Sequence, residues 1–328
     1  LDEPATMALF SGTEPLGVDP AALRSPVGTY GIPEFGTRFV RQMLAETRPR
    51  TFGELVRISG FSHGTGVWLN NARDLIRQGI CRLSEAIATR DDIMNYLLGR
   101  GMSPKRAFAI MERVRKGQGL TPEDRAEMQA LGVPAWFIGS CMRIEYLFPK
   151  AHAVAYVMMA FRIAYYKVYH PEAFYAAYFT VRADDLDSAT LLAGPEAVVR
   201  AIEAIEKKGP RATPKEKGLL PALEVALEMY LRGFRFRPVD LAASHATRFL
   251  VTPEGLLLPF VALPGVGRTA AENIVRAREA APFRSVEDLQ ERARLSRSVI
   301  QVLETHGCLI HLNGQMSWQG ILGAAPNI

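Results

Sequence analysis

The sequence feature that most restricts the fold of this chain is the stretch LPGVG at residues 263–267. It stands directly before a run of good helix formers, so its glycines lie where a helix begins. Glycine has no Cβ atom, which lets the backbone turn tightly at that point. Leu263 and Val266 would anchor the turn in a core, and Ile274 would face the same side from the helix. The stretch predicts a sharp turn whose free N–H groups, at the positive end of a helix, suit a phosphate.

Such a helix can be half of a DNA-binding hairpin, or it can follow a plain glycine-capped turn with solvated arginines. The order LPGVG and then AxxI resembles the helix-hairpin-helix, a module that binds DNA without reading its sequence. Residues 283–309 hold a second, half-similar unit, which favours the DNA-binding interpretation. Contacts of this kind reach phosphates and position a protein without reading bases. The predicted DNA-binding residues here are Gly265, Val266, Gly267, Arg268 and Arg276, with Arg278 as a further candidate.

Composition places the chain among packed globular proteins. It has 328 residues, enough for two or three domains, and 48% of them are apolar. The net charge of +5 weakly favours a polyanionic partner. The three cysteines form no CxxC pair, which argues against zinc and disulfides and fits a cytoplasmic location. We expect no membrane segment, because the longest apolar stretch, residues 151–166, contains Arg162 and is too short.

The periodicity of the sequence predicts a mainly α fold with a small β element. Residues 1–37 are rich in proline and glycine, which predicts irregular structure. Helical patterns follow, among them a helix that Thr121 would cap and a long helix over residues 151–169. Strand patterns lie within residues 234–261, after a polar, turn-rich stretch at 209–218 that we interpret as a linker.

A long aromatic and basic stretch covers residues 148–179. On a helix, His152 and Tyr156 are four residues apart and would share one face, with Lys150 and Lys167 among the aromatics. Such a face could stack a base and neutralise a triphosphate. The alternative is a core helix of Met and aromatic residues whose lysines extend to solvent, and periodicity by itself favours that alternative.

Several stretches resemble the bacterial C-family replicative DNA polymerases, and in particular the PolC-type DNA polymerase III alpha subunits. The fingers helix of that family resembles FPKAHAVAYVMMAFRIAYYKVYHPEAFYAAYFT. Close matches to the PolC type are GIPEFGTRFVRQML, ISGFSHGTGVWLNNA and TRDDIMNYL. The resemblance runs from about residue 1 to residue 308. It implies a mainly α architecture, with polymerase fingers followed by a helix-hairpin-helix duplex-binding domain and a small β element.

On this resemblance the chain divides into four parts. Residues 1–37 are an irregular segment that leads in from the palm, and residues 38–230 form the fingers. Residues 231–312 form a tandem helix-hairpin-helix domain, and residues 313–328 form a C-terminal tail. The chain opens with Leu1 rather than Met, and we expect it to be the C-terminal portion of a longer protein.

In this family the fingers hold the incoming deoxynucleotide and meet its triphosphate with basic side chains. The match to RDDIM implies that Arg90 binds the triphosphate, since a guanidinium fork suits phosphate oxygens; the alternative is a surface ion pair with Asp91 or Glu85. The match to FSHGT implies a loop beside the nascent base pair, whose glycines would let the backbone approach substrate. The dNTP-binding residues that the resemblance implies are Arg90, Lys150, His152, Ser62, His63, Gly64 and Thr65.

A strongly basic run occupies residues 103–119, with Glu112 as its single acidic residue. A solvated helix face and a contact to the DNA backbone or template explain this run equally well. The DNA contact would involve Lys105 and Arg106.

Polymerases of this class hold two Mg²⁺ ions on palm aspartates during nucleotidyl transfer. No stretch matches those aspartates, so the resemblance implies that they lie upstream and that this chain holds no catalytic residue and no metal. A grouped set, Asp184, Asp185 and Asp187, is better explained as the start of a surface helix. Asp91 and Asp92 are likewise interpreted as helix residues.

The predicted function is therefore the fingers and duplex-binding part of a DNA-directed DNA polymerase of bacterial replication, inactive by itself. Its partners would be primer–template DNA, dNTP and the remainder of the polymerase. The tail residues Gln315-Met316-Ser317-Trp318 loosely match a clamp-binding peptide, so the sliding clamp is a further predicted partner. The alternative is a disordered tail that binds no clamp. The alternative functions are a non-catalytic helix-hairpin-helix accessory or repair protein, which would ignore dNTP, and a helical scaffold.

Overall fold

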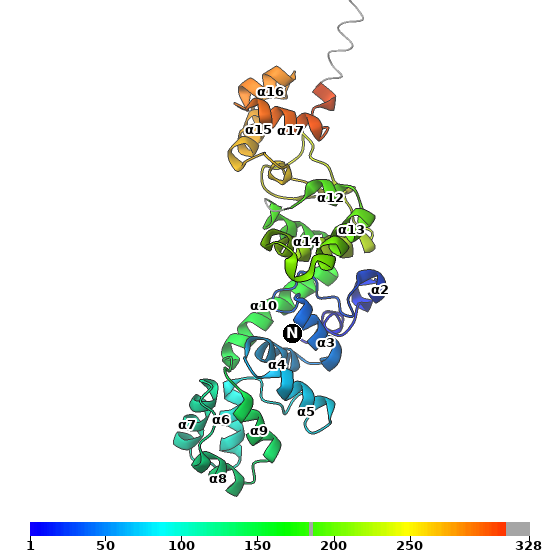
Figure 1. Ribbon diagram of the computed structural model, residues 1–328. Coiled ribbons are helices and arrows are strands. Elements are labelled where there is room, and N and C mark those ends of the chain that lie inside the picture. The colour runs from blue at the N-terminus through cyan, green and yellow to red at the C-terminus, as the bar shows by residue number, and fades with distance from the viewer. Residues whose placement is uncertain (184–185, 313–328) are drawn as a thin grey trace, which may run out of the picture. The chain divides into compact units, whose positions relative to one another are not determined.

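The computed structural model describes residues 1–183 and 186–312, and helices dominate this part of the chain (Figure 1). The prediction of a mainly α fold with a small β element is confirmed. The chain separates into two compact units, residues 1–168 and residues 169–328. The boundary that the sequence predicts at residue 230 lies inside the second unit. No helix in the described part is long and apolar enough to cross a bilayer.

The first unit consists of helices joined by short turns, and Figure 1 shows α6, α7, α8 and α9 gathered at one end of it. Along the chain these elements are α1 (Pro4–Ala8), η1 (Glu14–Leu16), α2 (Pro20–Leu23), α3 (Arg38–Thr47), α4 (Phe52–His63), η2 (Trp68–Ala72), α5 (Arg73–Arg77), α6 (Arg90–Gly99), α7 (Pro104–Arg115), α8 (Pro122–Ala130), α9 (Ala135–Arg143) and α10 (Lys150–Tyr169).

Threonine begins three of these helices by the same device. Thr51, Thr89 and Thr121 each form a capping box with the acidic residue three positions later. The predicted cap at Thr121 is confirmed, with Pro122 at the first helical position, where its missing N–H costs nothing. These starts are local, so the sequence is sufficient to place them.

The long predicted helix is confirmed as α10, whose buried residues include Ala153, Val157, Ala160 and Phe161. The core-helix interpretation expected the lysines of this helix to extend to solvent, but Lys167 does not. Lys167 is fully buried, and its ammonium group donates to the carbonyl of Gly28 at 2.7 Å and to that of Tyr30 at 2.6 Å. These charge-assisted bonds fix the glycine-rich segment near residue 30 to α10.

The second unit holds the remaining helices and three short strands. These elements are α11 (Pro171–Thr180), α12 (Ser188–Leu192), α13 (Pro195–Lys208), η4 (Gly209–Arg211), α14 (Pro214–Leu231), β1 (Phe236–Arg237), β2 (Leu250–Thr252), β3 (Gly255–Leu257), η5 (Phe260–Ala262), α15 (Arg268–Ala280), α16 (Val286–Arg292) and α17 (Arg297–Thr305).

The three strands form one sheet in the order β1-β3-β2. β1 pairs with β3 in parallel, and β2 pairs with β3 in an antiparallel hairpin whose turn is at Pro253 and Glu254. Phe179, Phe236 and Phe249 pack together behind this sheet, with ring centroids 4.9 and 5.8 Å from Phe179. The predicted β element is therefore confirmed, although its strands are only two or three residues long.

The stretch at 209–218 is not a linker between domains. After the short turn η4, Thr213 forms a capping box with Glu216 and starts α14, which continues to Leu231 and packs along α13. The polar residues that suggest a linker are helix-starting residues, and Gly218 lies within the helix.

Candidate nucleotide and DNA-binding sites

In the first unit, three separate stretches meet on one extended segment, residues 145–148. Thr65, just after α4, pairs with Tyr146, and Thr89, just before α6, pairs with Phe148. The same segment leads directly into α10 at Lys150. The structure thus brings together the FSHGT, RDDIM and FPKAH stretches, which lie up to about 90 positions apart in the sequence.

Aromatic rings line this meeting point in a continuous row. The His63 ring stacks on Phe148, with centroids 4.8 Å apart and an interplanar angle of 26°. Phe148 meets the edge of His152 at 5.8 Å, and His152 lies 5.7 Å from Tyr156 on the next turn of α10. His152 and Tyr156 are both exposed, as a face that stacks a base requires. Phe148 is the ring at the centre of the row, and the sequence did not single it out.

Two cations stand at the edge of this row. Arg90 is half-exposed, and its Nε lies 4.0 Å from the carboxylate of Asp91, the outer limit for an ion pair. That carboxylate accepts a hydrogen bond from the backbone N–H of Lys150 at 2.9 Å, so it holds the start of α10 beside α6. The Lys150 side chain forms no ion pair with any described residue. Glu85 forms an ion pair with Arg82 rather than with Arg90. The alternative to triphosphate binding, a surface ion pair of Arg90, is therefore limited to its weak contact with Asp91.

Ser62 and His63 belong to the last turn of α4, so the predicted loop begins only at Gly64. Its glycines, Gly64 and Gly66, have a reason within the fold. A Cβ on Gly64 would lie 3.0 Å from the carbonyl oxygen of Tyr146. Gly66 has a φ of 69°, and a Cβ there would lie 2.2 Å from the carbonyl oxygen of Arg143. These glycines let the loop pack against the backbone of residues 143–146, which explains them without a substrate.

The basic run on α7 is largely paired within the fold. Arg106 donates to Asp124 at 2.9 Å and to Glu127 at 2.7 Å, and the hydrogen bond to Glu127 raises the pKa of its guanidinium group. Arg115 donates to Glu112 at 2.7 Å and lowers the pKa of that carboxyl to about 2. Lys105 is exposed and forms no ion pair with a described residue. Of the two predicted α7 contacts, Lys105 is therefore available to DNA without breaking an ion pair.

In the second unit, the LPGVG stretch forms the predicted turn before α15. Leu263 and Val266 are buried, and the Val266 N–H donates to the Leu263 carbonyl at 3.0 Å. Gly265 has a φ of 94°, which a side chain would strain. Gly267 has a φ of −74°, and a Cβ there would meet nothing within 4 Å. The described fold therefore requires a glycine at 265 but not at 267.

A cleft of about 860 Å³ opens beside this turn. Residues 261–268 line it together with Lys215 and Leu219 of α14 and with Leu186 and Asp187, so a carboxylate also borders the cleft. Gly267 has no side chain to cap the amino end of α15, so no N-cap side chain occupies the first N–H groups of this helix. Arg268 is exposed at the same end. Lys215 adds a cation that sequence reasoning missed, because it precedes the hairpin by about 50 positions.

The second hairpin, between α16 and α17, has a backbone path similar to that of the first hairpin, but different residues occupy its turn. Arg294 takes the left-handed position with a φ of 52°, and Leu295 is buried after it. Ser296 then starts α17, and its hydroxyl accepts a hydrogen bond from the N–H of Val299 at 3.3 Å. A side chain thus occupies the amino end of α17, whereas the equivalent position before α15 is the bare Gly267.

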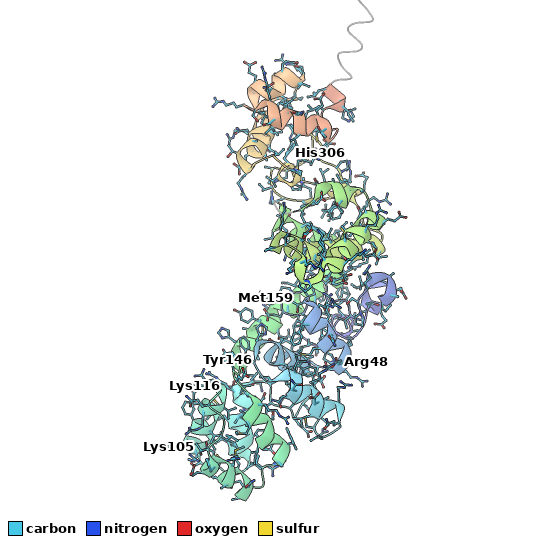
Figure 2. All side chains as sticks on the ribbon, viewed as in Figure 1. Arg48, Lys105, Lys116, Tyr146, Met159 and His306 are labelled. Carbon is cyan, nitrogen blue, oxygen red and sulfur yellow. The ribbon has the colours of Figure 1, made fainter. Side chains whose placement is uncertain are left out.

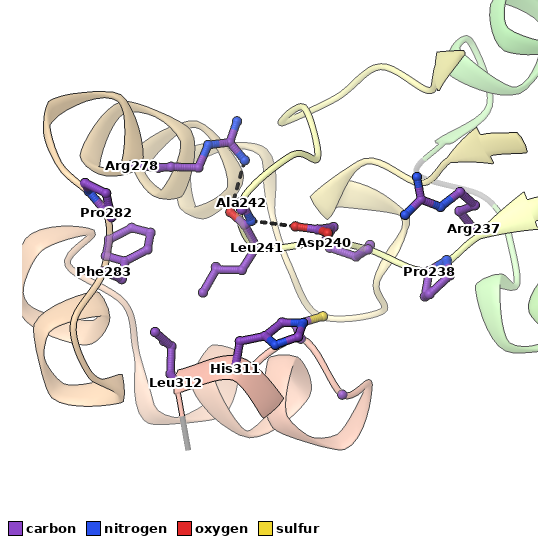
Figure 3. Close-up of a pocket in the computed structure, with 13 residues that line it drawn as sticks. Arg237, Pro238, Asp240, Leu241, Ala242, Arg278, Pro282, Phe283, His311 and Leu312 are labelled. Carbon is purple, nitrogen blue, oxygen red and sulfur yellow. Dashed lines mark hydrogen bonds between the residues drawn. The ribbon is translucent and has the colours of Figure 1, made fainter. Parts of the chain in front are cut away.

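The arginines of α15 differ in availability. Arg276 is exposed, but Arg278 donates to the carbonyls of Leu241 at 3.0 Å and Ser244 at 2.8 Å, and burial lowers its pKa. Figure 3 shows Arg278 reaching the main chain at Leu241, beside a pocket of about 430 Å³ that Phe283 also lines. Arg278 holds α15 to the loop after β1, so we do not retain it as a phosphate ligand.

The described residues hold no cluster of three or more His, Cys, Asp or Glu side chains that could bind a metal. Asp187 caps α12 by accepting from Thr190, and Asp184 and Asp185 lie outside the described residues. Asp92 belongs to the capping box of Thr89, so Asp91 and Asp92 act as helix residues, as predicted.

Residues 1–131 match the family described as the bacterial DNA polymerase III alpha subunit finger domain, and residues 233–317 match the helix-hairpin-helix motif. A relative named DNA polymerase III PolC-type, from Caldanaerobacter subterraneus subsp. tengcongensis, is 62% identical over 309 residues, which are 94% of this chain and 22% of that protein. The chain belongs to the PolC-type DNA polymerase III family.

Other PolC-type relatives align over the same length. Those from Thermotoga maritima and Bacillus subtilis are 57% and 56% identical over 94% and 96% of this chain. The chain covers 22% of each of these relatives. The resemblance seen in the sequence is confirmed, and so are its two parts, fingers and helix-hairpin-helix.

Proposed function

We propose that this chain is the fingers and duplex-binding part of a DNA-directed DNA polymerase that extends a primer with deoxynucleoside triphosphates. The match to the finger domain and the name of the PolC-type relatives support this. An accessory or repair protein is not favoured, since it would have no use for polymerase fingers. The other partner would be the remainder of the polymerase, and bacterial replication gives a cytoplasmic location.

The observation that carries the nucleotide site is the convergence of Arg90, Lys150 and the ring row at Phe148. Two cations beside exposed aromatic rings suit a triphosphate attached to a stacking base. The cations would stabilise the negative charge of the phosphates and orient them for attack by the primer. His63 and His152 flank the central ring. Ser62, Gly64 and Thr65 would shape the wall of the site rather than contact the phosphates.

Duplex DNA would lie against the first hairpin in the second unit. Backbone N–H groups from Gly265 to Arg268 would bind a phosphate, and Lys215 and Arg276 would add charge. In the first unit, Lys105 would contact the DNA backbone. Figure 2 shows Lys105, Lys116, Tyr146 and Met159 on the same side of this unit, and Tyr146 and Met159 are exposed apolar side chains.

The described residues do not fit a magnesium site, because no acidic cluster is present among them. We propose that palm carboxylates elsewhere in the parent polymerase hold Mg²⁺, and that this chain binds without catalysing. Gln315–Trp318, the predicted clamp-binding peptide, lies outside the described residues, and sliding-clamp contact stays a prediction.

The test of the nucleotide site is Lys150→Ala in the full-length parent polymerase, measured by primer extension. The KM for dNTP should rise about tenfold, because one phosphate contact contributes on the order of 1.4 kcal/mol. The matched control is Lys207→Ala on α13, which should leave the KM unchanged. An unchanged KM in both variants would reject Lys150 as a phosphate ligand.

A further inference from the structure

Glu34 has a backbone conformation that side chains rarely adopt. Its φ is 68°, in the left-handed region, although it is not a glycine. Such a residue is strained and persists only where its surroundings hold it in place. Pro33 precedes it, and Gly31 and Gly36 are close in the sequence. This left-handed position is nevertheless occupied by a residue with a carboxylate rather than by glycine.

The surroundings of Glu34 do hold it in place. The Thr29 hydroxyl donates to the carbonyl of Phe35 at 2.8 Å, which closes the loop around Glu34. Arg41 donates to the carbonyl of Gly36, and its guanidinium group lies 4.4 Å from the ring centroid of Tyr30. The loop is therefore fixed on both sides of the strained residue, and its shape determines where the carboxylate points.

The Glu34 carboxylate points at His63. One carboxylate oxygen, Oε2, lies 2.9 Å from Nε2 of His63, and the Glu34 side chain is only 18% exposed. The same oxygen is buried and makes no well-aligned hydrogen bond with a described residue. The contact with His63 Nε2 is the polar contact that the described residues provide for this buried oxygen.

His63 has acceptors on both sides of its ring. It is the last residue of α4, and its Nδ1 lies 2.9 Å from the carbonyl oxygen of Ser59. The Ser62 hydroxyl also lies 2.9 Å from Nδ1, so a hydroxyl and a carbonyl oxygen fix this side of the ring while Glu34 faces the other side. The contacts hold the ring flat on Phe148, the central ring of the nucleotide site.

We propose that Glu34 is a positioning residue for the nucleotide site, which orients the His63 ring against Phe148. The strained backbone of Glu34 would be retained because the carboxylate is needed at that place. This proposal rests on the proposed function, since it takes residues 62–65, at the end of α4, and Phe148 as one wall of the dNTP site. It adds the segment around residue 34 to the residues that determine nucleotide affinity.

The experiment uses the full-length parent polymerase carrying Glu34→Gln, with primer extension and duplex binding measured side by side. The KM for dNTP should rise about tenfold, while kcat and the Kd for primer–template change less than about twofold. Glu46→Gln is the matched control, because Glu46 also pairs with a cation, Arg73 at 2.7 Å, in the same unit. That variant should behave as the wild type does.

Two further variants separate the carboxylate from the shape of the loop. Glu34→Gly adopts the left-handed conformation without strain but lacks the carboxylate, so its KM should rise as in Glu34→Gln. In a His63→Gln background, Glu34→Gln should add no further increase, because the effect passes through His63. A wild-type KM in Glu34→Gly, or increases that multiply in the double variant, would overturn the proposal. If Glu34→Gln does not fold, the Glu34→Gly result decides.

Arg90→Ala, measured in the same assay, keeps the two hypotheses apart. A raised KM for Arg90→Ala with a normal KM for Glu34→Gln rejects only the role of Glu34. Normal KM values in both variants reject the nucleotide site itself.

Discussion

Basic side chains in this chain divide into those with partners in the fold and those without. Arg106 donates to carboxylates, Arg278 donates to backbone carbonyls, and the buried Lys167 donates to two carbonyls. Arg90 has only a carboxylate at 4.0 Å. Since a guanidinium group gains most from short, bidentate contacts, Arg90 is the one of these that a phosphate would bind most favourably.

Arg90→Ala in the full-length parent polymerase should lower kcat/KM for dNTP by about tenfold to a hundredfold, or roughly 1.4–2.8 kcal/mol of transition-state binding. Duplex affinity should stay unchanged, because Arg90 is not among the proposed duplex contacts. Steady-state primer extension and duplex titration measure the two quantities.

The matched control is Arg82→Ala, which removes an exposed arginine paired with Glu85 at 2.9 Å. Surface ion pairs of that kind contribute little, so the kinetics should not change. Equal kinetics for Arg82→Ala and Arg90→Ala would exclude Arg90 from the triphosphate site.

At the scale of one residue, the sequence predicts a residue's local role better than it predicts its partners in the fold. The cap at Thr121 needs only Asp124, three positions away, and was predictable. The same Asp124 also accepts a hydrogen bond from Arg106, which lies 18 positions upstream, and that contact depends on how α7 packs against α8. Glu34 was missed for the same reason, because its distance from His63 is set by the fold.

At the scale of one element, the two hairpins follow similar paths but offer different groups. Gly267 leaves the amino end of α15 open, whereas Ser296 caps α17 with its hydroxyl. An open end presents several N–H donors to an anion, and a capped end presents fewer. The pattern of glycines predicted the first hairpin correctly, but the half-similar second unit gave no sign that its donors are occupied.

Exchanging the two residues tests this difference. Gly267→Ser should form a side-chain cap on α15, since its φ of −74° suits serine and its Cβ would meet nothing within 4 Å. The free energy of unfolding should rise or stay equal, while duplex affinity falls about threefold to tenfold and the slope of log K against log salt decreases by up to about 0.9.

The reciprocal change, Ser296→Gly, is the control. It should cost only a few tenths of a kcal/mol in stability and should not weaken duplex binding. Fluorescence anisotropy of a labelled duplex at several salt concentrations would measure both variants. Unchanged affinity and salt slope in Gly267→Ser would reject the phosphate site at this hairpin.

At the scale of the whole chain, the resemblance to a family supplied what periodicity could not. Apolar spacing predicted helices and a small sheet, but periodicity favoured α10 as a plain core helix. In the fold, part of α10 is buried as a core helix is, while His152 and Tyr156 remain exposed, as the proposed base-stacking face requires. The division into two units at residue 168 was not predicted, since α10 continues through it without a break in its pattern.

The cysteines give a prediction for the whole chain, because both units contain them. Cys81 and Cys141 in the first unit and Cys308 in the second are free and buried, and burial raises the pKa of each thiol, that of Cys308 to about 11. A thiol reacts as its thiolate, so a raised pKa keeps it protonated and unreactive until the pH rises toward that value. An unperturbed thiol is about half ionised at pH 8.5, whereas Cys308 would be ionised to less than about 1%.

Alkylation of Cys308 in the folded chain with iodoacetamide at pH 8.5 should therefore be at least about a hundredfold slower than in guanidinium chloride, where the thiol is exposed. Cys81 and Cys141 should also react more slowly in the folded chain than in the denatured chain. Mass spectrometry would count the modified sites over time. Cys308→Ser, an isosteric control, should reduce the denatured count by one and leave the slow native rate unchanged. Rapid modification of any one thiol in the folded chain would show that its part of the core is open to solvent, contrary to the burial found in both units.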